Sequence, residues 1–192
     1  MRKLFWGFFF IYLNFNLNVN QYSLNVLPDF VGYILLMKGI DLLKEESVFF
    51  EKARPFSVGM AVYTAVLWVG ALLGVTGEAG LITKLLNLLA SAVGLYISWL
   101  LIQGAAEIEE VHSVDLNRER LLTLWKALVA VQVIMDVLQL MQSHANVSVL
   151  AAFSVLLIVA ELIVIVMYLI AWKKTADIWE TLPKQTLEFE GE

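Results

Sequence analysis

Residues 147–172 read VSVLAAFSVLLIVAELIVIVMYLIAW, and Lys173 and Lys174 follow them directly. A helix rises about 1.5 Å per residue, so about 20 apolar residues are enough to cross the hydrocarbon layer of a bilayer. This stretch is longer than that, and Glu161 is its one charged side chain. A pair of lysines is typical of the point where a helix leaves a membrane. The stretch therefore predicts a transmembrane helix.

The composition extends this interpretation to the whole chain. Of 192 residues, 60% are hydrophobic and 16% are charged, and the mean hydropathy is +0.77. A soluble domain usually carries about 25% charged residues, because it needs a polar shell against water. Three further segments are long and apolar enough to span a bilayer: residues 56–75, 81–103 and 121–141. Pro55 precedes the first of them and marks its expected start.

Two shorter segments, residues 4–19 and 28–43, bring the expected total to about six. Each is short for a full helical span, so they form either tilted spans or a re-entrant hairpin that enters and leaves on one side. The first contains an alternation of asparagine with apolar residues: Asn14, Asn16, Asn18 and Asn20. This alternation predicts either an unwound end that lines a cavity or a strand-like external loop.

These segments predict an all-α, polytopic transmembrane helix bundle. Residues 1–182 are expected to form a single transmembrane helical domain, and residues 183–192 a short acidic cytoplasmic tail. The start, a basic Met1–Lys3 followed by apolar residues, is superficially similar to a signal peptide. No small-residue cleavage site follows it, so we expect a retained first membrane segment.

The basic residues predict the orientation, because lysine and arginine are held on the cytoplasmic side of a membrane. With the N-terminus inside, eleven of them fall in cytoplasmic segments and none falls in an external loop. The eleven are Arg2, Lys3, Lys38, Lys44, Lys52, Arg54, Arg118, Arg120, Lys173, Lys174 and Lys184. The sequence therefore predicts a multi-pass protein of the cell (cytoplasmic) membrane with both termini in the cytoplasm.

Two carboxylates within the expected spans are the first candidate site residues. An ionisable side chain inside a membrane costs about 2.5–3.5 kcal/mol on insertion scales, so Asp136 and Glu161 should face protein or water. Gln132 and Gln139 share the helical face of Asp136, at spacings of four and three residues. In the preceding span, polar residues recur at helical spacing: Lys84, Asn87 and Ser91.

Two interpretations of these residues remain open. In the first they form a polar path between three helices, as in proton- or cation-coupled transport. In the second they are buried structural pairs, with Lys84 opposite Asp136 on the outer side and Lys126 opposite Glu161 on the inner side. Gly70 and Gly74 form a GxxxG pattern, which predicts either internal helix packing or a homodimer face.

Several function classes are excluded or disfavoured. The chain has no cysteine, and His112 and His144 are far apart in the sequence. No metalloprotease, nucleophile-elbow or P-loop motif occurs, so we expect neither an enzyme nor a bound cofactor or metal. No basic patch with interleaved aromatics indicates nucleic acid.

The stretches Leu4-Phe5-Trp6-Gly7-Phe8 and Leu27-Pro28-Asp29-Phe30-Val31-Gly32-Tyr33 carry a family resemblance. The start of the chain resembles uncharacterised small multi-pass membrane proteins of Gram-positive bacteria. The resemblance covers about the first fifth of the chain, and it implies a bacterial cytoplasmic membrane without implying an activity.

Two functions follow from the sequence as hypotheses. The first is a membrane partner or scaffold protein, because the loops are short and the glycine face is suited to a membrane-protein partner or a homo-oligomer. The alternative is a small proton- or cation-coupled transporter or channel-like protein that uses the intramembrane carboxylates. Under both hypotheses, the lipid bilayer is expected to surround the helices.

Overall fold

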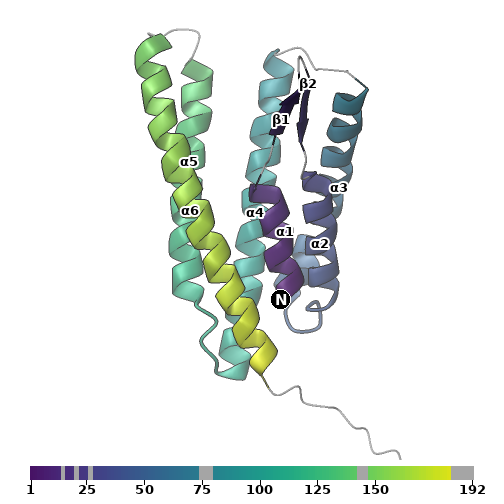
Figure 1. Ribbon diagram of the computed structural model, residues 1–192. Helices are drawn as coiled ribbons and strands as arrows, with labels where there is room; N and C mark the ends of the chain where they lie inside the picture. The colour runs from purple at the N-terminus through teal and green to yellow at the C-terminus, as the bar shows by residue number, and fades with distance from the viewer. Residues whose placement is uncertain (14–15, 20–21, 26–27, 74–79, 142–146, 183–192) are drawn as a thin grey trace, which may run out of the picture.

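The computed structural model describes residues 1–13, 16–19, 22–25, 28–73, 80–141 and 147–182. These residues form six helices and one two-stranded hairpin (Figure 1). In chain order the elements are α1 (Arg2–Tyr12), β1 (Asn16–Val19), β2 (Tyr22–Asn25), α2 (Asp29–Asp41), α3 (Val48–Leu72), α4 (Leu81–His112), α5 (Arg118–Met141) and α6 (Val147–Thr181).

Four helices, α3 to α6, are long and apolar enough to cross a membrane. The predicted helical membrane protein is therefore confirmed, but the predicted count of about six spans is wrong. Helices α1 and α2 have 11 and 13 residues. At about 1.5 Å per residue they are roughly 16 and 20 Å long, well short of a bilayer's hydrocarbon core of about 30 Å.

The six helices pack in a closed ring. Each helix from α1 to α5 contacts the next one along the chain, and α6 returns to contact α1. The connections alternate between the two ends of the bundle, so neighbouring helices run in opposite directions (Figure 1). Because α1 and α6 close the ring, the first and last helices of the chain meet on one wall of its interior.

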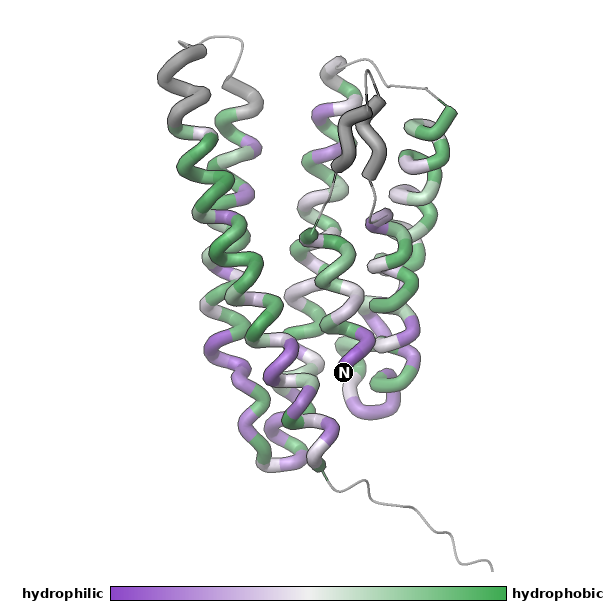
Figure 2. Tube along the Cα trace, in the orientation of Figure 1, coloured by the Kyte–Doolittle hydropathy of each residue, from purple (hydrophilic) through white to green (hydrophobic). Residues whose placement is uncertain are grey.

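Charge is gathered at one end of the ring. Figure 2 shows hydrophilic residues gathered where α1 begins and α6 ends, and beyond them a mainly hydrophobic band that isolated hydrophilic residues on α4 and α5 interrupt. We call this the basic end, and it includes Arg2, Lys44, Arg118 and Lys173. Large apolar side chains such as Leu156 remain exposed in the hydrophobic band. An apolar exterior of this kind is suited to contact with lipid.

The first 41 residues form a composite hairpin of helix and strand. Strand β1 pairs antiparallel with β2, in a register that places Asn16 opposite Asn25 and Asn18 opposite Ser23. The strand-like alternative for the asparagine alternation is therefore confirmed, and the helical part of residues 4–19 ends at Tyr12. The physical reason is the period of two, which matches a strand and not a helix. Helix α1 begins at the basic end of the ring, and helix α2 ends there (Figure 1).

Helix α3 begins eight residues earlier than predicted. Ser47 is its N-cap, and the Ser47 hydroxyl accepts a hydrogen bond from the backbone N–H of Phe49 at 3.1 Å. Pro55 lies inside the helix and does not open it. A serine cap satisfies one of the N–H groups that the first turn leaves without a helical partner, and this signal fixes the start more strongly than the proline.

The other long helices agree closely with the sequence. Helix α4 continues past its membrane stretch to His112, and a break with left-handed residues at Ser113 and Asn117 precedes α5. Helix α6 continues past Trp172 and ends at Thr181.

Glycines allow the two short helices to pack closely. Gly7 of α1 and Gly32 of α2 are both buried and face each other, and Gly39 faces Leu4. A Cβ atom at any of the three would lie under 3.0 Å from an atom of the facing helix. The glycine pair that the sequence singled out is placed differently, because Gly70 is half-buried on α3 and Gly74 lies outside the described residues.

Candidate functional site

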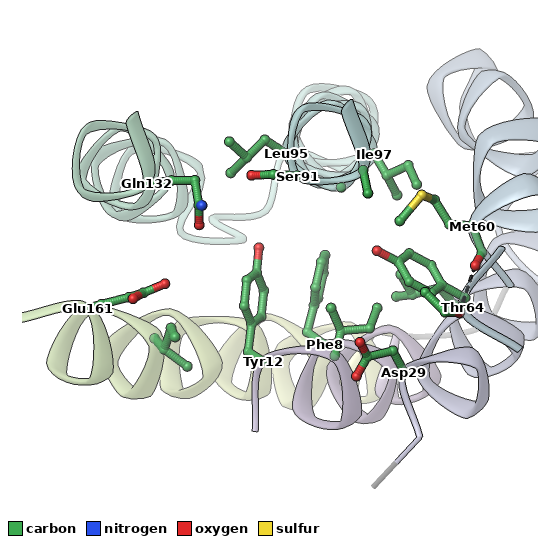
Figure 3. Close-up of a pocket in the computed structure, with 16 residues that line it drawn as sticks. Phe8, Tyr12, Asp29, Met60, Thr64, Ser91, Leu95, Ile97, Gln132 and Glu161 are labelled. Atoms are coloured by element: carbon green, nitrogen blue, oxygen red, sulfur yellow. Dashed lines mark hydrogen bonds between the residues drawn. The ribbon is translucent and has the colours of Figure 1, made fainter. Parts of the chain in front are cut away.

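A cavity of about 300 Å³ lies at the centre of the ring (Figure 3). Every helix contributes to its wall. The lining residues are Phe8, Ile11 and Tyr12 from α1; Asp29, Tyr33 and Leu36 from α2; Met60 and Thr64 from α3; Ala90, Ser91, Gly94, Leu95 and Ile97 from α4; Gln132 from α5; and Glu161 and Ile165 from α6. A volume of this size is at the small end of the range for ligand pockets.

The cavity exists because α1 and α2 are short. Helix α1 ends at Tyr12 and α2 begins at Asp29, and both of these residues line the cavity. The last carbonyls and the first N–H groups of a helix have no partner within that helix, so two polar helix ends meet the cavity here. Backbone of this kind is tolerated at membrane depth only where it is buried in protein or lines a cavity. Asp29, in the first turn of α2, also complements the positive end of the helix dipole.

The described lining residues carry negative charge only. Two carboxylates, Asp29 and Glu161, line the cavity, and its lining includes no lysine, arginine or histidine. Figure 3 shows the two carboxylates on opposite sides of the cavity, with Tyr12 and Phe8 between them. The negative ends of the cavity are thus separated by aromatic rings.

Hydroxyl and amide groups accompany the carboxylates. Tyr12, Ser91 and Gln132 project into the cavity on the side of Glu161 (Figure 3). Thr64 lies on the side of Asp29, and its hydroxyl donates to the Met60 carbonyl at 2.7 Å. Each carboxylate therefore has oxygen-bearing side chains on its own side of the cavity.

Four aromatic residues pack together between α1 and α6, and two of them, Phe8 and Tyr12, line the cavity. We call them the aromatic plug: Phe8, Tyr12, Tyr168 and Trp172. The Phe8 and Trp172 ring centroids are 5.2 Å apart, and the Tyr12 and Tyr168 rings meet edge to face at 5.9 Å. Tyr168 and Trp172 have no exposed surface. Both follow Glu161 along α6 toward the basic end, so the plug lies below the carboxylate.

A hydrogen bond joins the plug to α4. The hydroxyl groups of Ser98 and Tyr168 are 2.5 Å apart, and both residues are fully buried. A buried hydroxyl without a partner is costly, so this bond fixes the orientation of the Tyr168 ring. Helices α1, α4 and α6 are thereby held together beneath the cavity.

Three of the predicted site residues line the cavity: Glu161, Gln132 and Ser91. Asp136 does not line it, but one of its carboxylate oxygens accepts a hydrogen bond from the Gln132 amide at 3.1 Å. Asp136 and Glu161 are also close enough for their charges to interact across α5 and α6. The sequence thus identified one wall of the cavity, formed by α4, α5 and α6.

The predicted lysine–carboxylate pairs are wrong. The ion pairs within the described part of the chain are Arg2–Glu180, Arg54–Asp41, His112–Glu46 and Arg118–Glu110, and all four are at the basic end. Lys126 is exposed on α5, and Lys84 is half-buried in the first turn of α4. A lysine near a helix end can extend its stem to reach the membrane surface, so neither needs an internal carboxylate.

Two further candidates of the polar face lie elsewhere. Asn87 is exposed and is not among the cavity residues. The side chain of Gln139 lies outside the described residues. The predicted stripe on α4 therefore reaches the cavity at Ser91 and Gly94.

The α1–α2 half of the cavity was missed from the sequence. Asp29, Tyr12, Tyr33 and Thr64 line the cavity but were not among the site residues predicted from the sequence. Asp29 directly follows Pro28, and that signal could have identified a helix that begins inside the membrane layer.

The chemistry of the cavity suits a cation. Carboxylates, hydroxyls and an amide oxygen accept hydrogen bonds from ammonium groups, and aromatic faces attract positive charge. Within the described ranges, no group of three or more histidine, cysteine, aspartate or glutamate side chains is arranged to hold a metal ion.

Comparison of the chain with protein-family models, with curated proteins and with solved structures finds no match. The function is therefore argued from the cavity and its surroundings.

Proposed function

We propose that this membrane protein is a small transporter that binds a cation in the central cavity. The observation that carries the proposal is the pair of carboxylates, Asp29 and Glu161, in a cavity whose described lining includes no basic side chain. All six helices contribute to that lining, so a bound cation would interact with the whole ring.

The cost of burying charge supports this proposal. Each ionised carboxylate costs about 2.5–3.5 kcal/mol at membrane depth on insertion scales. Two such groups that share one cavity also repel each other, unless a proton or a cation neutralises them. A bound cation offsets both costs, so the empty, fully ionised cavity is the unfavourable state.

The aromatic plug supports transport over simple binding. Tyr168 and Trp172 lie on α6 between Glu161 and the basic end, and the plug packs where α1 and α6 close the ring. A carrier exposes its site to one side of the membrane at a time. In this proposal, separation of α1 from α6 would open the cavity toward the basic end.

The orientation and the membrane are part of the proposal. Ten of the eleven basic residues that the sequence assigned to the cytoplasm lie at the basic end, and Lys184 lies outside the described residues. Because basic residues are held inside, we propose that the basic end is cytoplasmic. The N-terminal resemblance favours a bacterial cytoplasmic membrane.

The test is a measurement of charge movement in proteoliposomes. Rapid jumps in sodium, potassium, proton or methylammonium concentration are applied to the purified chain on a solid-supported membrane. At least one of these cations should give a transient current that Glu161→Gln and Asp29→Asn abolish. Glu119→Gln, an exposed carboxylate at the start of α5, is the matched control. No current with any of these four cations, nor with a linear alkyl diamine, would overturn the proposal.

A partner or scaffold role is the first function that the sequence predicts. Gly70 is half-buried on α3, and its neighbours Val66 and Val69 are exposed. A helix face of this kind can pack against another membrane helix or against lipid. It therefore does not distinguish a protein partner from the bilayer. Specific co-purification of a membrane protein that Gly70→Leu disrupts would support this role.

A further inference from the structure

The two carboxylates of the cavity lie on opposite sides of it and belong to different helices. Glu161 is on α6 and Asp29 is on α2, and Figure 3 shows Tyr12 and Phe8 of α1 between them. The cavity is continuous between the two sides, because both carboxylates line it. Its ligand therefore meets one negative group at each end and aromatic rings in the middle.

We propose that the ligand is a linear alkyl diamine, a dication with one ammonium group at each end. This inference rests on the proposed cation site and names its substrate class. One ammonium group pairs with Glu161, and the other pairs with Asp29. The methylene chain lies over the rings of Phe8 and Tyr12.

The polar groups at the two ends suit ammonium groups. An alkyl ammonium carries three N–H donors and no acceptor. On the side of Glu161, the Tyr12 and Ser91 hydroxyls and the Gln132 amide oxygen are available as further acceptors. On the side of Asp29, the Thr64 hydroxyl oxygen can accept while its hydrogen is donated to the Met60 carbonyl.

The middle of the cavity suits a methylene chain. Its apolar lining includes Ile11, Leu36, Leu95 and Ile165, which come from four different helices. Aromatic faces beside an alkyl ammonium add a favourable electrostatic attraction. A cavity of about 300 Å³ admits a ligand of few heavy atoms, as a short diamine is.

An inorganic ion fits this arrangement less well. Calcium takes about six to eight oxygen ligands at about 2.3–2.6 Å, and magnesium takes a near-octahedral set. Carboxylates on opposite sides of aromatic rings cannot both ligate one such ion. A single monovalent cation would contact one of the two carboxylates and not the other.

The test is isothermal titration calorimetry of the full chain in lipid nanodiscs. The probes are diaminopropane, diaminobutane, diaminopentane and diaminohexane, with butylamine, sodium and potassium for comparison. Diamines should bind about tenfold or more tightly than butylamine, with one preferred chain length, because two charged hydrogen-bonding ends are satisfied together. Glu161→Gln and Asp29→Asn should each lower diamine affinity to that of butylamine and remove the length preference.

Two length-changing variants make the test independent of lost folding. Asp29→Glu adds one methylene to the side chain, so the preferred diamine should become shorter. Glu161→Asp removes one methylene, so the preferred diamine should become longer. Both variants keep the charge, and opposite shifts of the optimum are expected only if the ligand bridges the two carboxylates.

The outcomes separate this inference from the proposed cation site. If butylamine, sodium or potassium binds as tightly as every diamine, or if the optimum does not move in the length-changing variants, the diamine inference is wrong and the cation site stands. If none of the seven probes binds to the correctly folded chain, both are wrong.

Discussion

Gly7 of α1 and Gly32 of α2 meet backbone to backbone. A Cβ atom added to Gly7 would lie 2.9 Å from the Gly32 carbonyl oxygen, and one added to Gly32 would lie 2.8 Å from the Gly7 carbonyl oxygen. This contact holds together the two short helices whose inner ends, Tyr12 and Asp29, line the cavity. The position of the cavity therefore depends on two residues that have no side chain.

Gly32→Ala should destabilise the protein by about 1–3 kcal/mol, because the added methyl overlaps the Gly7 backbone, which cannot move aside as a side chain can. Thermal unfolding in detergent measures the effect. Gly59→Ala is the matched control, since no atom lies within 4 Å of its added Cβ. The control should be neutral or slightly stabilising, because alanine favours a helix. Equal stability of the two variants would contradict the packing described here.

Tyr168→Phe should destabilise the aromatic plug by about 1–3 kcal/mol, because it removes the buried hydrogen bond between the Tyr168 and Ser98 hydroxyls. The ring itself and its contacts with Phe8 and Trp172 are retained. Unfolding of Tyr168→Phe, Ser98→Ala and the double variant forms a double-mutant cycle. The double variant should lose less stability than the sum of the single variants. Strict additivity would show that the two hydroxyls do not interact.

Ser47→Ala should cost about 1 kcal/mol, because the first turn of α3 loses its side-chain cap. The Ser47 hydroxyl also donates to the Glu107 carboxylate of α4, so the same change removes a link between two helices. Ser47→Thr keeps the hydroxyl and serves as the control. The measurement compares the melting temperatures of the two variants and the natural protein in one detergent. If Ser47→Ala melts at the same temperature as the natural protein, Ser47 does not stabilise the start of α3.

Single cysteines should report the orientation cleanly, because the natural chain has none. Gly80→Cys lies at the end opposite the basic end and should react with a membrane-impermeant maleimide in intact cells. Lys44→Cys, in the connection between α2 and α3, should react only after permeabilisation. Both positions are exposed, so burial does not confound the comparison. Labelling of Lys44→Cys in intact cells would reverse the proposed topology.

The long helices were predictable because each carries its own signal. The apolar length of α4, α5 and α6 marks each helix within one stretch of sequence, and charged residues follow the apolar stretches of α4 and α6. The strands at Asn16 and Asn25 were predictable as an alternative for the same reason, since a period of two is local. The start of α3 was misplaced because Ser47 and Pro55 give competing local signals, and the cap prevailed.

The cavity was only half predictable, because it depends on how the ring closes. Glu161, Gln132 and Ser91 stood out as polar residues in apolar helices. Tyr12 is unremarkable in the sequence, and it lines the cavity because α6 returns to α1 across the full length of the chain. The lysine pairings failed because depth along a helix does not specify the direction in which a side chain points.

The most direct test of the central claim is the reactivity of Ser91→Cys toward charged thiol reagents. Ser91 lines the cavity on the side of Glu161, so its thiol samples the potential that the carboxylates create. A small cationic methanethiosulfonate should modify it at least about tenfold faster than an anionic reagent of similar size, because the negative cavity concentrates cations. Leu156→Cys, on the apolar exterior of α6, should react with neither. No reaction at Ser91→Cys, or equal rates with the two reagents, would contradict a cation-binding cavity at the centre of the ring.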